Sequence, residues 1–152
     1  MLKRNLIPLL ILLFINNCGF TPIYNTSEKM DYNIVLIEKE GDNIINNKII
    51  SEITRLAKKD SNKIFNIKLT TNYSKSIISK DAKGSATNYE ISVSAIFNIE
   101  YENTSKQIVI NEKQKIKKIA DIFEQRNYEN TLKNNFALSI VNKLNIELLS
   151  IK

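Results

Sequence analysis

A long alternation of apolar and polar residues, NYEISVSAIFNIEY at positions 88–101, constrains the fold more than any other feature of the chain. Because successive side chains of a β-strand point to opposite faces, this period of two predicts a strand with one apolar and one polar face. The apolar face holds Tyr89, Ile91, Val93, Ala95, Phe97, Ile99 and Tyr101. The polar face holds Asn88, Glu90, Ser92, Ser94, Asn98 and Glu100, with only Ile96 out of step. A one-residue slip in pairing would expose the whole apolar set, so the register is well specified.

The other periodicities predict three further strands and two helices. Strands are expected at residues 32–38, 65–73 and 107–118, and helices from about 43 to 59 and from about 128 to 149. Asp42 or Asn43 is the expected N-cap of the first helix. The resulting order, β-α-β-β-β-α, predicts an α+β fold: a single layer of mostly antiparallel four-stranded sheet covered on one face by two helices.

The start of the chain has the layout of a secretory signal peptide. Lys3 and Arg4 precede an apolar run over residues 6–15. That run is too short for a membrane-spanning helix, which needs about 20 apolar residues. We therefore expect a signal peptide at residues 1–17, a lipid-anchored tether at 18–30 and a single α+β domain at 31–152.

The apolar run ends at Cys18, the only cysteine of the chain, in a pattern that resembles a bacterial lipobox. Asn17 stands where such signals usually carry Gly, Ala or Ser. The resemblance implies cleavage before Cys18, covalent lipid on its thiol and, because Gly19 rather than Asp follows, sorting to the outer membrane. The other interpretation of Cys18 is a free, buried thiol.

The composition argues against most catalytic and cofactor-binding classes. Histidine is absent, and there are only three glycines and one cysteine. The commonest general base, the usual nucleophile pairs and a glycine-rich phosphate loop are therefore missing. We expect no enzyme, no metal, no nucleic-acid partner and no cofactor beyond the lipid on Cys18, although catalysis by serine with lysine or by paired carboxylates stays open.

A group of lysines is the candidate site for an anionic ligand. Three of them alternate along the last predicted strand and would project from one face, because every second residue shares a face. Two others lie in the polar turn before the long strand. Lysine binds phosphate as a point charge. We term this group the lysine surface: Lys80, Lys83, Lys113, Lys115, Lys117 and Lys118. The alternative role is that of edge-strand lysines, which block aggregation between sheets.

Three segments together resemble the LptE family of lipopolysaccharide-assembly lipoproteins. They are the start CGFTPIY at 18–24, the strand TNYEISVSAIFNIEY at 87–101 and the closing helix NTLKNNFALSIVNKLNIELL at 130–149. The resemblance implies an outer-membrane lipoprotein on the periplasmic side. Its partner would be the β-barrel LptD, which it plugs and helps to assemble, so that lipopolysaccharide is transported to and inserted at the cell surface. The lysine surface would then contact lipopolysaccharide.

Other interpretations of the same residues remain. The polar side chains Asn88, Ser92, Ser94 and Asn98 could contact the barrel or form an ordinary solvated sheet face. The chain could also be an unrelated periplasmic lipoprotein that binds a small ligand or peptidoglycan, or an enzyme that uses carboxylates or serine.

Overall fold

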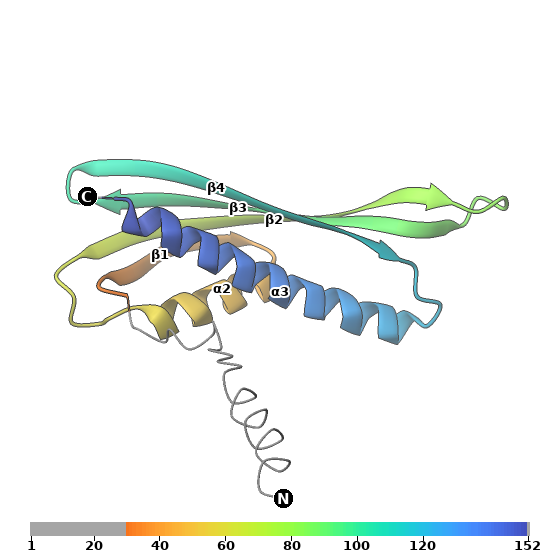
Figure 1. Ribbon diagram of the computed structural model, residues 1–152, viewed down its shortest axis with the longest axis horizontal. Helices are drawn as coiled ribbons and strands as arrows, with labels where there is room; N and C mark the ends of the chain where they lie inside the picture. Colours follow the sequence, from red (N-terminus) through yellow and green to blue (C-terminus); the bar gives the residue numbers. More distant parts are fainter. Residues whose placement is uncertain (1–29, 152) are drawn as a thin grey trace, which may run out of the picture.

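The computed structural model describes residues 30–151, so the predicted signal peptide and nearly all of the tether lie outside the described part. The elements follow in the order β1 (Asn33–Gly41), α2 (Asn43–Leu56), β2 (Ile64–Lys80), β3 (Ala86–Tyr101), β4 (Thr104–Lys117) and α3 (Ile122–Leu149). The strands form one sheet in the order β1-β2-β3-β4. Only β1 and β2 are parallel; the other neighbours are antiparallel. Both helices cover the same face (Figure 1), and the predicted α+β fold is confirmed. We call the opposite side of the sheet the helix-free face.

The turn from β1 into α2 depends on a glycine and an aspartate. Gly41 has a φ of +103°, and a Cβ placed there would lie 1.8 Å from the carbonyl oxygen of Thr71. Asp42 is the N-cap: its Oδ1 accepts hydrogen bonds from the backbone N–H groups of Ile44 and Ile45 at 3.0 and 3.1 Å. These bonds satisfy donors that have no partner within the helix, so the helix begins here.

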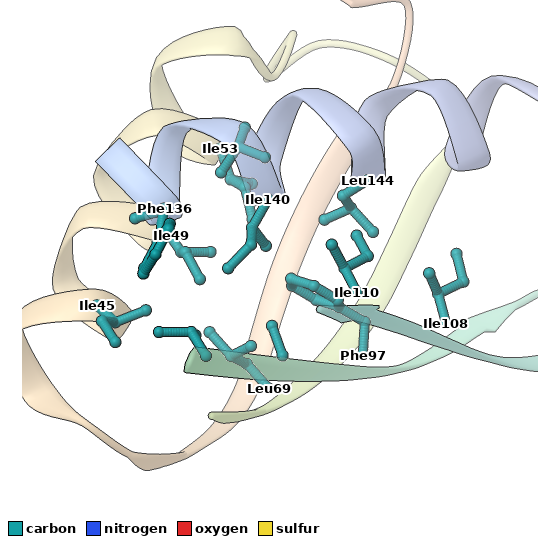
Figure 2. Close-up of a cluster of buried hydrophobic side chains, with 14 of the residues drawn as sticks. Ile45, Ile49, Ile53, Leu69, Phe97, Ile108, Ile110, Phe136, Ile140 and Leu144 are labelled. Carbon is teal, nitrogen blue, oxygen red and sulfur yellow. The ribbon is translucent and has the colours of Figure 1, made fainter. Parts of the chain in front are cut away.

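The core fills the space between the sheet and the two helices. Figure 2 shows side chains of α2 and α3 directed toward the sheet, namely Ile45, Ile49, Ile53, Phe136, Ile140 and Leu144 opposite Leu69, Phe97, Ile108 and Ile110. Five of the seven apolar residues of the predicted alternation are buried along β3, whereas Tyr89 and Tyr101 at its ends are half-buried; Phe97 is fully buried. Complete burial of such a side chain stabilises the fold by about 1.5–3 kcal/mol.

Helix α3 and strand β2 are much longer than their patterns indicate, and the other three strands are longer by about two residues. Helix α3 begins at Ile122 rather than near residue 128, because the side chain of Asp121 accepts hydrogen bonds from the N–H groups of Phe123 and Glu124, both at 2.8 Å. Strand β2 continues to Lys80, well past residue 73. The β2–β3 hairpin therefore extends beyond the N-terminal end of α3 (Figure 1). Helix α2 is shorter than expected and ends at Leu56, since Ala57 has left the helical conformation.

Candidate anion-binding surface and polar sheet face

The alternating lysines of β4 lie on the helix-free face. The pairing of β3 with β4 places Lys113 opposite Ser92, Lys115 opposite Glu90 and Lys117 opposite Asn88. All three lysines are exposed. Every second residue of a strand is about 6.8 Å along, twice the rise per residue. The ammonium groups can therefore line up along one edge of this face, as their spacing in the sequence predicts.

The three remaining lysines of the lysine surface lie in the β2–β3 hairpin and directly after β4. Lys80 is the last residue of β2, Lys83 lies in the turn of the β2–β3 hairpin, and both are exposed. The turn is shaped by Asp81, whose Oδ1 accepts hydrogen bonds from the N–H groups of Lys83 and Ser85 at 2.9 and 2.8 Å. After β4, the N–H of Lys118 donates to the carbonyl oxygen of Thr87 at 2.8 Å and extends the pairing by one residue.

Only part of the lysine surface is brought together around one hollow. An open depression of about 590 Å³ lies beside the hairpin and is lined by Asp81, Ser85, Ala86, Thr87, Asn88, Lys117, Lys118 and Ala120. Lys80, Lys83, Lys113 and Lys115 do not line it. Asp81 was not among the predicted site residues. The turn sequence DxKGS does, however, indicate an aspartate whose side chain accepts a hydrogen bond from the backbone N–H two residues later. An anion in this depression is therefore best placed near Lys117 and Lys118, away from Asp81.

The lysine surface carries charge that is not neutralised internally. Within residues 30–151, eight pairs of basic and acidic groups lie within 4.0 Å, and none includes a member of the lysine surface. Lys115 and Glu90 are register partners, yet they are not among these pairs. The six ammonium groups are thus available to an external anion.

A second hollow crosses the polar side chains of the helix-free face. It measures about 480 Å³ and is lined by Asn72, Ser74, Glu90, Ser92, Val93, Ser94, Asn111, Glu112 and Lys113. In the register, Ser92 lies between Ser74 and Lys113. Short hydroxyl and amide side chains make this floor polar without filling it, so it can accept the side chains of another molecule.

Two of the predicted polar residues are already engaged within the sheet. The Nδ2 of Asn88 donates to Oγ of Ser79 at 2.5 Å, and the Oδ1 of Asn98 accepts from Nε2 of Gln107 at 2.8 Å. Ser92 and Ser94, by contrast, line the second hollow. The serines are therefore better placed than the asparagines to bond a partner.

The helix side of the sheet holds a separate set of charged groups that fix α3. Glu129 of α3 pairs with Lys75 of β2 and accepts hydrogen bonds from Gln125 at 2.6 Å and from the hydroxyl of Tyr73 at 3.4 Å. Burial acts to raise the pKa of the Glu129 carboxyl, but these bonds and the Lys75 charge hold it below its ordinary value. Burial and the Glu129 charge raise the pKa of Tyr73 to about 12. These groups are structural, and no pattern in the sequence indicates that they meet.

The described part of the chain contains no helix long and apolar enough to cross a membrane. Cys18, the predicted lipid attachment site, lies outside the described residues.

The resemblance to known proteins is structural. No protein-family model matches the sequence, and no curated protein matches it. The crystal structure of rare lipoprotein B from Shewanella oneidensis is similar, with a TM-score of 0.58, 12% identity, and 78% of this chain and 98% of that chain covered. The chain has the fold of that lipoprotein. A minor lipoprotein from Acinetobacter baumannii is also similar, with a TM-score of 0.51, 9% identity, and coverage of 76% of this chain and 92% of that chain.

Proposed function

We propose that this protein is an outer-membrane lipoprotein of the LptE type. It is held on the periplasmic side by lipid on Cys18, plugs the β-barrel LptD, assists its assembly and takes part in lipopolysaccharide transport to the cell surface. The observation that carries the proposal is the polar hollow around Ser92 and Ser94 on the helix-free face, in a fold shared with rare lipoprotein B. We propose no catalytic role, because the chain has no histidine and its single cysteine is assigned to the anchor.

The second hollow of the helix-free face suits a polar partner. Burying a hydroxyl or amide without a hydrogen bond is unfavourable, so contact with an apolar surface would be destabilising at this hollow. The lumen of a wide outer-membrane barrel is polar. Ser92 and Ser94, at the floor of the second hollow, can bond side chains from such a wall. Interfaces of this kind are held by direct and water-mediated hydrogen bonds.

The lysine surface suits the lipopolysaccharide itself. This ligand carries phosphates and acidic sugars, and the six lysines have no carboxylate within 4.0 Å in the described residues. Lys117 and Lys118 stand beside a depression that can hold a phosphate group. The β2–β3 hairpin brings Lys80 and Lys83 to the end of the molecule that extends past α3 (Figure 1).

Purification of the affinity-tagged full chain from envelopes tests the barrel partnership. We expect a large outer-membrane barrel to co-purify. Ser94→Arg, in the middle of the helix-free face, should reduce barrel recovery, because a long cation occupies the second hollow. Asn142→Arg makes the same charge change on the exposed side of α3 and should leave recovery unchanged. Absence of any barrel with the unmodified chain would overturn the proposal.

A further inference from the structure

Strand β4 is an edge strand with an unprotected segment between Lys106 and Glu112. It ends the sheet order, and no strand of residues 30–151 pairs with its outer edge. Its register with β3 runs without a shift from residue 104 to 117, whereas the opposite edge, β1, is interrupted by a bulge between Leu36 and Glu38. Bulges and lysines are the usual means of preventing edge-to-edge pairing. On β4 the alternating lysines begin at Lys113, and Lys106 is the only lysine of the strand before them, so residues 107–111 lack this protection.

The unprotected segment is uncharged, and its three central residues are apolar. Its sequence is QIVIN at residues 107–111, and the side chain of Val109 is 50% exposed. Beside it lies a groove of about 460 Å³ between β4 and α3, lined by Ile108, Val109, Ile110, Asn111, Lys143, Ile146 and Glu147. Ile146 is 70% exposed. A strand added to this edge would place alternate side chains in the groove, against Ile146.

The segment is complementary to itself in one antiparallel register. With Val109 opposite its own copy, Ile108 faces Ile110, Gln107 faces Asn111 and Lys106 faces Glu112. Apolar residues then meet apolar residues, and the charges that meet are opposite, which stabilises cross-strand pairs. In this register Lys113 faces Ser105 rather than another lysine.

Other registers on the same faces are worse. The two nearest registers, centred on Ile108 and Ile110, place Lys106 opposite Ile110 and Ile108 opposite Glu112, so a charge meets an apolar side chain. A register centred on Lys113 places two ammonium groups opposite each other. Registers displaced by an odd number of residues would set the free N–H and C=O groups of one copy opposite residues of the other copy that already bond β3, so no ladder could form. The charges at the ends of the groove suit the same arrangement. Glu112 pairs with Lys143 at 2.8 Å, and Lys106 pairs with Glu147 at 3.1 Å. In the dimer Glu112 would lie opposite the Lys106 of the copy, so these two pairs would join into one network of opposite charges.

We propose that two copies of this chain associate through β4, antiparallel about Val109, to form one continuous sheet with all helices on the same face. A two-fold interface requires one patch to complement itself, which the QIVIN segment does. The inference is independent of the proposed function. Because the shared surface is one strand edge and one groove, we expect a weak, concentration-dependent dimer rather than an obligate one.

Disulfide formation tests the register directly. In the full chain carrying Cys18→Ser, Val109→Cys is the only thiol and would lie opposite its copy. We expect mild oxidation of the purified protein to give a disulfide-linked dimer. Val35→Cys is the matched control, because Val35 lies on the other edge strand and is 45% exposed. The proposal is overturned if neither variant cross-links, or if both do so equally.

Sedimentation of a second variant tests the association without a covalent bond. Val109→Lys places two like charges opposite each other at the two-fold axis and should leave the chain monomeric at concentrations where the unmodified chain dimerises. Val35→Lys should still dimerise. Circular dichroism should show both variants folded, since each valine is about half exposed. Equal dimerisation by Val109→Lys, or open-ended aggregation of the unmodified chain in place of a dimer, would contradict the proposal.

Discussion

The hydroxyl of Tyr32 donates a hydrogen bond of 2.6 Å to Oδ1 of Asn145 and joins the residue before β1 to the C-terminal part of α3. Both residues are buried, and the Tyr32 ring packs edge-on against Phe65 with ring centres 5.4 Å apart. Burial raises the pKa of Tyr32 to about 12, so the hydroxyl remains a donor at neutral pH. This bond fixes the point at which the predicted tether enters the domain.

Replacing Tyr32 with Phe should destabilise the domain by about 1–3 kcal/mol. The ring is retained, but Asn145 Oδ1 loses its donor in a buried place, and an unsatisfied buried acceptor costs about that much. Urea denaturation of the unmodified and variant chains measures the difference. Tyr128→Phe is the control, because Tyr128 is 40% exposed. Equal effects of the two substitutions would show that the buried bond contributes little.

Gly41→Ala should be much more destabilising than Gly84→Ala. Both glycines have positive φ, +103° and +82°, so each substitution carries a conformational cost of about 1 kcal/mol or more. At Gly41 the added Cβ also collides with the carbonyl oxygen of Thr71, 1.8 Å away, whereas at Gly84 no atom lies within 4 Å. Thermal unfolding of the two variants measures the difference. Similar melting temperatures would mean that the β1–α2 turn can move away from β2 at little cost.

The alternation at residues 88–101 was sufficient to predict β3, because both of its neighbours and the core select one face. The end of β2, residues 74–80, has no such signal. There Lys75 occupies the helix side and pairs with Glu129, a contact that depends on the tertiary fold. The lysine spacing on β4 likewise follows from the strand period. That Asp81 and Lys117 line the same depression could not be predicted, because their proximity depends on the conformation of the hairpin turn.

Acidification should loosen the attachment of α3. Hydrogen bonds and charge from Lys75 hold the pKa of Glu129 below its ordinary value of 4.5 despite burial, and Lys133 does the same for Asp42, whose ordinary value is 3.8. A carboxyl with a lowered folded-state pKa stabilises the fold fully above its unfolded pKa, and this contribution is lost as the pH falls through the folded-state value. Stability should therefore fall below about pH 4.5.

Unfolding by urea between pH 7 and pH 3 measures this dependence. Glu129→Gln should lower stability at pH 7, because Lys75 loses its charged partner, and should make the loss on acidification shallower. Glu124→Gln is the control: Glu124 lies on the same helix and is exposed. An unchanged pH profile in Glu129→Gln would show that Glu129 is not one of the groups responsible.

Removing charge from the lysine surface should weaken binding of purified lipopolysaccharide. We expect Lys115→Ser with Lys117→Ser to lower affinity several-fold at low salt and to reduce its salt dependence, because two exposed point charges are lost. Lys39→Ser with Lys59→Ser removes the same charge from exposed positions outside this surface and should have a much smaller effect.

Binding can be measured by titration calorimetry with full-length protein, after circular dichroism has shown that both variants are folded. Equal losses in the two variants would indicate attraction by net charge alone. No loss in either would remove β4 from the proposed contact, and its lysines would then serve to protect the sheet edge.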